Sequence, residues 1–164
     1  MWIVGDIDDE CGMAILQGLA APGSDAVTIH INSSGGKLCW TFAICAAIAE
    51  SRLHVTTIVE GRAMSGGCFI AMAGHTRLCA FGSEYLWHGC ICQSDGTAID
   101  NAASVRSQEA TDDAIVALSA AHSKKSAGYW REVLAKNTDY WLTADDALAF
   151  GLVDEIVGIP KKMP

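Results

Sequence analysis

The feature that most constrains the fold is a unit that occurs twice in succession: an apolar strand, a turn rich in Gly and Ser, and an apolar helix. The first copy has its strand, turn and helix at residues 26–32, 33–36 and 38–49. The second copy has them at residues 55–61, 63–67 and 68–73. This order is typical of an α/β fold with a mostly parallel sheet, in which functional turns follow the carboxyl ends of the strands.

Further elements are predicted on both sides of this unit. Strands are expected at residues 2–5, 76–80, 85–88 and 152–157, and helices at residues 9–19, 129–135 and 144–150. A long helix is expected from about residue 97 to 124, where apolar residues recur among charged ones, as in helices that protrude or mediate association. The 164 residues suffice for one core and no linker divides them, so residues 1–164 are expected to form a single domain.

Composition argues against several classes of partner. Half of the residues are apolar (51%) and only 18% are charged, so much of the chain is expected to be buried, within the domain or between copies of it. A net charge of −8 argues against a nucleic-acid partner. The apolar runs are too short to span a membrane and the first residues do not resemble a signal peptide, so we expect a cytoplasmic protein without membrane attachment.

Seven cysteines are many for this length. An odd number without a secretory signal is typical of free, mostly buried thiols. The only close pair, Cys90 and Cys92, lacks the two-residue spacing of zinc and redox sites, and no second pair completes a tetrahedral site. We therefore expect neither a metal nor another cofactor.

Ser65, in the turn of the second unit, is the first candidate for catalysis. A serine at the start of a buried helix can expose its hydroxyl, while the helix supplies N–H groups and a positive dipole. That is the logic of a nucleophile elbow, although the Gly-x-Ser-x-Gly pattern is absent. Taken alone, Ser65 is better explained as an ordinary helix N-cap, since serine caps are common.

Two further side chains and one turn are candidates for the same chemistry. His88 ends an apolar strand where a loop begins, a suitable place for a base. Asp139 precedes the apolar residues 140–142 and is expected to be partly buried, and a buried carboxylate needs a partner. Gly35 and Gly36 let the backbone present N–H groups to an oxyanion, although an ordinary tight turn would contain the same glycines.

In their order along the chain, these segments resemble the proteolytic subunit of the Clp proteases, and more closely its shorter phage and prophage relatives. The resemblance is carried by Asn-Ser-Ser-Gly-Gly at residues 32–36, Gly-Arg-Ala-Met-Ser-Gly-Gly at 61–67, His88 after a short apolar strand, and Asp-Tyr-Trp-Leu-Thr-Ala-Asp-Asp-Ala at 139–147. Gly-Leu-Val-Asp-Glu at residues 151–155 matches the usual ending. The likeness extends over nearly the whole chain.

The resemblance implies a serine endopeptidase that cleaves peptides, unfolded proteins or viral structural proteins. Ser65 would be the nucleophile, His88 the base and Asp139 the group that orients the imidazole. The backbone N–H groups of Gly36 and Gly66 would form the oxyanion hole. The fold would be the one that Clp peptidases share with crotonases, and the cell would be bacterial or phage-infected.

The resemblance also implies an assembly. Residues 97–124 would form the handle through which two rings, expected to be heptameric, stack and thereby order the triad. The chain begins almost at the first core strand, without the family's axial loop and first helix, so an ATP-driven unfoldase partner is left open and a self-standing peptidase is favoured. Ser34 replaces the usual proline, and Gly66 replaces a larger residue, which is expected to widen or soften the site.

Two alternatives remain open from the sequence. A crotonase-type acyl-CoA enzyme would share the fold and hold a thioester oxyanion with two backbone amides, but it would not need Ser65, His88 and Asp139 together. A non-catalytic ring subunit would only assemble with active partners, although such subunits typically lose a member of the triad.

Overall fold

The computed structural model describes residues 1–21, 23, 25–91, 97–136 and 138–159. The elements follow in the order β1 (Trp2–Ile7), α1 (Asp9–Ala20), β2 (Ala26–Gly36), α2 (Leu38–Ala49), β3 (His54–Met64), α3 (Gly66–Ala73), β4 (Thr76–Ala80), β5 (Glu84–Trp87), α4 (Ala98–Ala121), α5 (Ala127–Ala135), β6 (Tyr140–Thr143), α6 (Ala144–Phe150) and β7 (Glu155–Val157). The predicted α/β class is confirmed.

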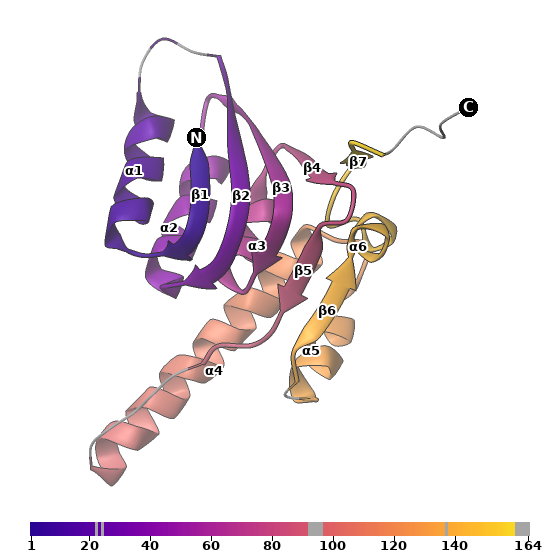
Figure 1. The fold of residues 1–164 in the computed structure, drawn as a ribbon. Coiled ribbons are helices and arrows are strands. Elements are labelled where there is room, and N and C mark those ends of the chain that lie inside the picture. The colour runs from indigo at the N-terminus through magenta and orange to yellow at the C-terminus, as the bar shows by residue number, and fades with distance from the viewer. Residues whose placement is uncertain (22, 24, 92–96, 137, 160–164) are drawn as a thin grey trace.

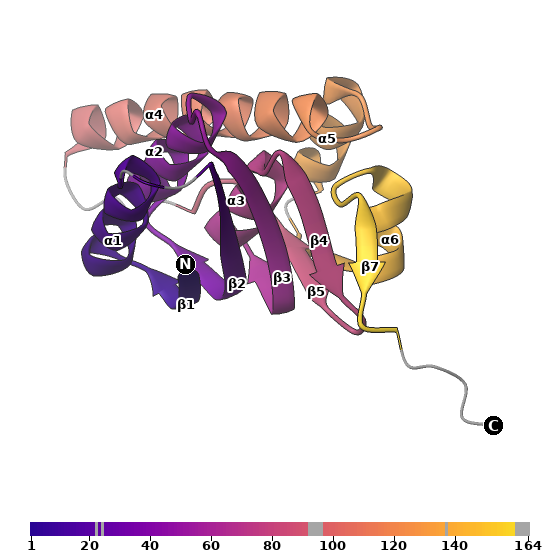
Figure 2. The same cartoon turned by 90° about the horizontal axis from the view of Figure 1, so that it is seen from above.

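The strands form one sheet, in which β1, β2, β3, β4 and β7 lie side by side in that order and pair in parallel. Helices α1, α2 and α3 cover one face of this sheet, and α4 lies on the same side (Figure 1, Figure 2). The opposite face of β1 to β4 carries none of the described helices (Figure 2). One-sided covering explains why apolar and polar residues alternate along the strands.

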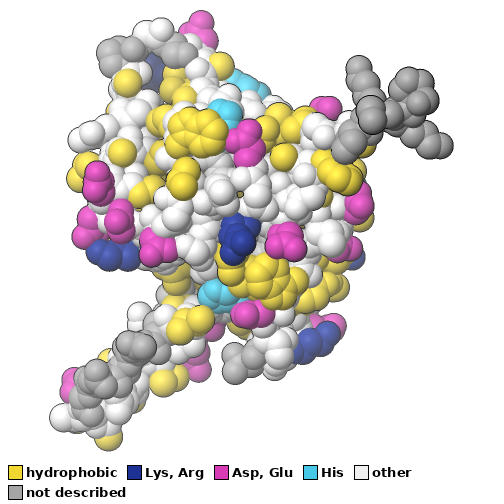
Figure 3. All heavy atoms as spheres, in the orientation of Figure 1, with side chains coloured by type: hydrophobic (Ala, Val, Ile, Leu, Met, Phe, Trp, Pro, Cys, Tyr) yellow, Lys and Arg dark blue, Asp and Glu magenta, His cyan; other side chains and the backbone are white. Residues whose placement is uncertain are grey.

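Hydrophobic, histidine, acidic and basic side chains are mixed on the uncovered face of the sheet (Figure 3). Trp2 on β1 stacks on His30 of β2, with ring centroids 4.1 Å apart. His30 Nδ1 in turn lies 3.0 Å from Glu60 Oε2 of β3. These three side chains are thus in contact across β1, β2 and β3 on the face without helices.

The sheet divides at β3, which is the longest strand together with β2. The first half of β3 pairs with β4 at residues 56–59, and its last residues, 62–64, pair with β5. Strand β5 then pairs antiparallel with β6, with Trp87 opposite Tyr140. The branch brings the ends of β3, β5 and β6 close together, and the candidate residues are found there.

Strand β2 is longer than the sequence predicts. Residues 33–36, expected to form a turn, continue the strand, and Gly35 and Gly36 pair with Asp6 and Ile7 of β1 across a register shift. The two glycines have φ values of 93° and 150°, so the chain bends here without losing its pairing. The glycine segment is therefore held by the sheet rather than left as a loop.

The end of the chain also differs from the prediction. Strand β6 was not predicted, although its apolar residues were noted. The expected strand 152–157 is reduced to β7, and Leu152 and Val153 are buried in the loop that precedes it. Helix α6 agrees with the prediction: Thr143 and Asp146 form a capping box, and Gly151 ends the helix with a φ of 74°.

Trp87 anchors β5 in the core. Its side chain is 1% exposed, stacks on Trp130 of α5 with ring centroids 5.0 Å apart, and meets Phe69 of α3 edge to face. Its indole Nε1 donates a 2.8 Å hydrogen bond to Ser119 Oγ of α4. Since a buried indole whose N–H is satisfied packs in one orientation, Trp87 fixes the end of β5 directly before His88.

The long helix expected from residue 97 to about 124 is α4. It begins with a capping box between Thr97 and Asp100 and ends at His122. Only its second half is buried, at Ile115, Val116 and Ser119, whereas its first half extends away from the sheet (Figure 1). In the described part of the chain, neither α4 nor any other helix is long and apolar enough to cross a membrane.

Candidate active site

The carboxyl ends of three parallel strands meet at one edge of the sheet. Ser65 follows β3, Gly36 ends β2, and His88 follows β5. Because β2 and β5 both run parallel to β3, these three residues lie at the same edge. Residues far apart in sequence are thus brought together by strand direction.

Asp139 reaches the same edge from an antiparallel strand. The pairing of Trp87 with Tyr140 puts the next two residues, His88 and Asp139, opposite each other at the ends of β5 and β6. The prediction that Asp139 is partly buried is wrong: Asp139 lies directly before β6, which pairs on one side only, and its side chain is exposed.

Ser65 has an unusual backbone conformation, with φ 50° and ψ −121°. Among the described residues that are not glycine, it alone has a positive φ. It occupies the N-cap position of α3, but its hydroxyl makes no capping hydrogen bond, and its N–H donates to Leu86 O at 2.8 Å. The cap interpretation therefore does not account for the side chain. Strain at a residue with a free hydroxyl is common at functional sites.

Two glycines allow the backbone to close around Ser65. A Cβ added to Gly35 would stand 2.6 Å from the Cβ of Ser65, so only glycine fits there. A Cβ on Gly66 would collide with Thr41 Oγ1 of α2, a fully buried side chain. The expected widening of the site at Gly66 is thus not seen, because Thr41 occupies the space that a larger residue would fill.

His88 is half-buried, and its ring is held by the backbone of the next residue, Gly89. Its Nδ1 lies 2.5 Å from the carbonyl oxygen of Gly89. A carbonyl can only accept, so Nδ1 carries the proton of the neutral ring and Nε2 is left with a free lone pair. This tautomer has the basic nitrogen that a general base requires.

Two adjoining cavities share His88. The first, of about 240 Å³, is lined on its polar side by Ser34, Gly36, Ser65 and His88, and on its apolar side by Leu38, Phe69, Ile91 and Ile115. The second, of about 180 Å³, contains His88 and Asp139. The structure therefore brings Ser65, Gly36 and His88 around one cavity and Asp139 around the next. Within the described residues, no hydrogen bond joins His88 to Ser65 or to Asp139.

The second cavity contains two residues that sequence reasoning missed, Gln108 and Asp112 of α4. Asp112 Oδ1 accepts a 2.6 Å hydrogen bond from Cys90 N–H, and Gln108 Nε2 donates a 2.7 Å hydrogen bond to Cys90 O. Their spacing of four residues puts both on one face of the helix. Nothing in the sequence indicated that this face would meet the segment after His88.

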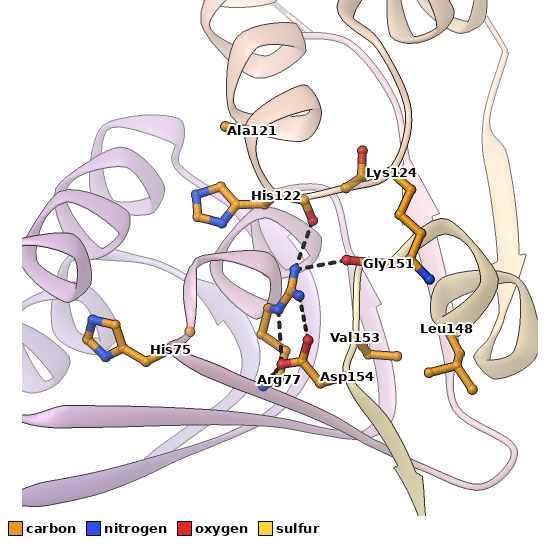
Figure 4. A pocket seen from close by; sticks show the side chains of 11 residues that line it. His75, Arg77, Ala121, His122, Lys124, Leu148, Gly151, Val153 and Asp154 are labelled. Carbon is orange, nitrogen blue, oxygen red and sulfur yellow. Dashed lines mark hydrogen bonds and ion pairs between the residues drawn. The ribbon is translucent and has the colours of Figure 1, made fainter.

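A larger cavity, of about 540 Å³, lies away from these residues, around Arg77 of β4 (Figure 4). The Arg77 guanidinium donates to His122 O at 2.8 Å, to Gly151 O at 2.9 Å and to the carboxylate of Asp154. Burial raises the pKa of Asp154, but the hydrogen bonds and charge of Arg77 outweigh it and hold that pKa below its ordinary value. Arg77 thus ties the ends of α4 and α6 to β4.

Free thiols are found at Cys11, Cys39, Cys45, Cys68 and Cys79. Cys39 is exposed and Cys11 is half-buried, whereas the buried ones are Cys45, Cys68, Cys79 and Cys90. Burial raises the pKa of Cys45 and of Cys68 to about 12. Cys92 lies outside the described residues. Among those described, no group of three or more His, Cys, Asp or Glu side chains could hold a metal ion.

Comparison with known proteins identifies the family. A sequence model of the Clp protease family matches residues 1–160. The chain belongs to the Clp protease family. The resemblance drawn from the motifs is confirmed, and membership of the Clp protease family indicates a peptidase.

Individual members of the Clp protease family are distant in sequence. The ATP-dependent Clp protease proteolytic subunits of Streptococcus pyogenes serotype M5 (strain Manfredo), Streptococcus gordonii and Streptococcus equi subsp. equi are each 25% identical to this chain over 174 residues. These alignments cover 94% of this chain and 82% of each relative.

Proposed function

We propose that the protein is a serine endopeptidase in which Ser65 is the nucleophile. The observation that carries this proposal is the strained backbone of Ser65, whose hydroxyl makes no capping bond and shares a cavity with His88. A serine that only capped α3 would need neither feature. The match to the Clp protease family supports a peptidase over the acyl-CoA enzyme considered from the sequence.

His88 acts as the general base through Nε2. It removes the proton of Ser65 Oγ as that oxygen attacks the carbonyl carbon of a peptide, and it later delivers this proton to the leaving amine. Water then hydrolyses the acyl-enzyme by the same two proton transfers. The bond between Nδ1 and Gly89 O supports this role, because it keeps Nε2 unprotonated.

The backbone N–H groups of Gly36 and Gly66 stabilise the oxyanion of the tetrahedral intermediate. Gly66 is the first residue of α3, so its N–H lies at the positive end of the helix dipole. Gly36 lines the cavity that contains Ser65. One such donor contributes about 3–4 kcal/mol to transition-state stabilisation.

Asp139 is the orienting carboxylate of the active assembly. To take this role, the carboxylate approaches His88 across the cavity that both residues line and accepts from Nδ1–H together with the Gly89 carbonyl. We infer that this approach accompanies assembly into stacked rings, in which the exposed first half of α4 meets its counterpart and the start of β6 is covered.

The substrates are peptides or unfolded proteins. The apolar wall of the first cavity, including Leu38, Phe69 and Ile115, favours an apolar side chain beside the cleaved bond. The relatives are named ATP-dependent proteolytic subunits, so we include a homo-oligomeric ring and an ATP-dependent unfoldase partner in the proposal.

The test is covalent labelling of the assembled protein with a fluorophosphonate, followed by mass mapping. Labelling is expected at Ser65, and it should fall at least about a hundredfold in His88→Ala. The matched control is Ser34→Ala, since Ser34 lines the same cavity but donates its hydroxyl to Asp6. Labelling at Ser34 instead of Ser65 would refute the proposal.

A non-catalytic ring subunit is the second candidate, and one observation favours it. Asp139 is exposed and has no hydrogen bond to His88. If rings form but Ser65 stays unlabelled, the non-catalytic ring subunit replaces the serine endopeptidase as the proposed function. Size-exclusion chromatography with light scattering on the same sample shows whether rings have formed.

A further inference from the structure

The backbone of Cys90 is held on both sides by α4. Its N–H donates to Asp112 Oδ1 at 2.6 Å, and its carbonyl oxygen accepts from Gln108 Nε2 at 2.7 Å. The two side chains act as a clamp on residues 88–90, the segment that directly follows β5. A loop without secondary structure needs such partners for its backbone groups.

Gly89 makes the clamp possible. A Cβ added at Gly89 would stand 2.9 Å from Asp112 Oδ1 and would collide with Leu134 of α5. With glycine at this position, the segment packs directly between α4 and α5. The contact between Asp112 and this backbone therefore depends on the glycine, and it is not a chance contact of two surface groups.

A single peptide unit, between Gly89 and Cys90, connects the clamp to the proposed base His88. The carbonyl oxygen of Gly89 accepts from His88 Nδ1, and the N–H of the same peptide unit is the Cys90 N–H that Asp112 binds. A peptide unit is planar, so the direction of its N–H fixes the direction of its carbonyl oxygen. Holding the N–H toward α4 thus holds the carbonyl toward the imidazole.

We propose that Asp112 is a positioning residue for His88: by binding the Gly89–Cys90 peptide unit, it sets the tautomer and orientation of the imidazole from the handle helix. The inference rests on the proposed serine endopeptidase function. It also links that site to α4, because any movement of the helix near residue 112 turns the peptide unit and with it the base.

The first experiment measures the rate of Ser65 labelling by a fluorophosphonate across pH in assembled protein. Asp112→Ala removes the acceptor and is expected to slow labelling by about tenfold to a hundredfold, the effect of a misplaced catalytic group. Asp112→Asn keeps an acceptor oxygen and is expected to restore the rate to within about threefold of wild type. The control is Asp113→Ala, because Asp113 is an exposed neighbour that pairs with Arg131 instead.

The second experiment determines directly by NMR which imidazole nitrogen of His88 carries the proton, and it does not require an active enzyme. In protein labelled with ¹⁵N-histidine, the His88 signals are assigned among the five histidines with His88→Gln. Wild type should show a protonated Nδ1 and an unprotonated Nε2 at a pH where the ring is neutral, whereas Asp112→Ala should show a mixture of tautomers. If Asp112→Ala does not fold, Gln108→Ala removes the other half of the clamp and takes its place in both measurements.

The outcomes separate the two proposals. No labelling of assembled wild type would overturn the peptidase function, while the tautomer measurement would still decide the role of Asp112. Equal labelling rates and equal His88 tautomers in wild type and a folded Asp112→Ala or Gln108→Ala variant would overturn the positioning role. A loss of thermal stability without a change in either readout would make Asp112 a merely structural residue.

Discussion

Gly35 and Ser65 are in such close contact that a Cβ added to Gly35 would stand 2.6 Å from the Cβ of Ser65. The two residues belong to different strand–helix units, and each has a backbone that most residues avoid, with φ values of 93° and 50°. The two copies of the repeated unit therefore form a single site, because the glycine segment of the first packs against Ser65 of the second.

This contact predicts that Gly35→Ala destabilises the fold and blocks the site. The added methyl group meets Ser65 and the strained φ costs about 1–3 kcal/mol, so the midpoint of urea unfolding should fall and fluorophosphonate labelling of Ser65 should drop at least about tenfold. The control is Gly82→Ala, since Gly82 has a similar φ of 82° with open space around it. Gly82→Ala should lose stability but keep labelling; equal labelling in the two variants would contradict the prediction.

The contact between Gly66 and Thr41 predicts a compensating pair of substitutions. Gly66→Ala alone should lower the free energy of unfolding by about 1–3 kcal/mol, because its methyl group collides with the buried Thr41 hydroxyl. Thr41→Ala removes that hydroxyl, so the double variant should recover at least about 1 kcal/mol of the loss in a double-mutant cycle. Additive effects, measured by urea unfolding, would show that Thr41 does not limit the size of the residue after Ser65.

The ion pair between Arg77 and Asp154 predicts a stability difference that depends on pH. The pKa of Asp154 is lower in the folded than in the unfolded protein, so its stabilisation is present above the unfolded pKa of about 3.9 and is lost as the pH falls through the folded pKa. Asp154→Asn should therefore cost about 1 kcal/mol near neutral pH, a value reduced by the partial exposure of the pair.

The measurement for this pair is thermal or urea unfolding of wild type and Asp154→Asn from neutral to acid pH. The difference between them should shrink below a pH of about 4. Asp113→Asn is the control, since its partner Arg131 and Asp113 itself are both largely exposed, and its effect should be small at every pH. A difference that grows toward acid pH would contradict the assigned direction.

The cysteines should differ strongly in reactivity. Cys39 is exposed and should be alkylated by N-ethylmaleimide first among the described cysteines, whereas burial raises the pKa of Cys45 and Cys68 to about 12 and keeps both thiols protonated and covered. Peptide mapping of the native protein over time measures this order. Rapid modification of Cys68 in folded protein would show that α3 opens far more often than its burial suggests.

Much of the fold could be predicted because the responsible signals are local. Helix α6 needed only a capping box at Thr143 and a glycine at residue 151, and β4 needed only an apolar run between turns. Residues 33–36 were misjudged because the pattern Ser-Ser-Gly-Gly favours a turn, while pairing with β1 keeps it extended. Local propensity cannot reveal which strand lies alongside.

The residues of the candidate site were predicted from the sequence, but the contacts that they make were not. Ser65, His88, Asp139, Gly36 and Gly66 each follow from a motif. That Asp139 is exposed, that His88 binds the Gly89 carbonyl, and that α4 holds the next peptide unit follow from no motif. These facts depend on side chains separated by many residues in the chain.

The sequence by itself determined most of the strands and helices in their order, the positions of the two glycine segments and the identity of Ser65 as the residue at the head of a buried helix, since periodicity and turn chemistry act over a few residues. Only the tertiary structure decided that Gly35 touches Ser65, that Thr41 fills the space beside Gly66, and that Asp112 reaches the His88 segment. The physical reason is that close packing is set by which elements meet, and this depends on the direction and pairing of strands distant in the chain.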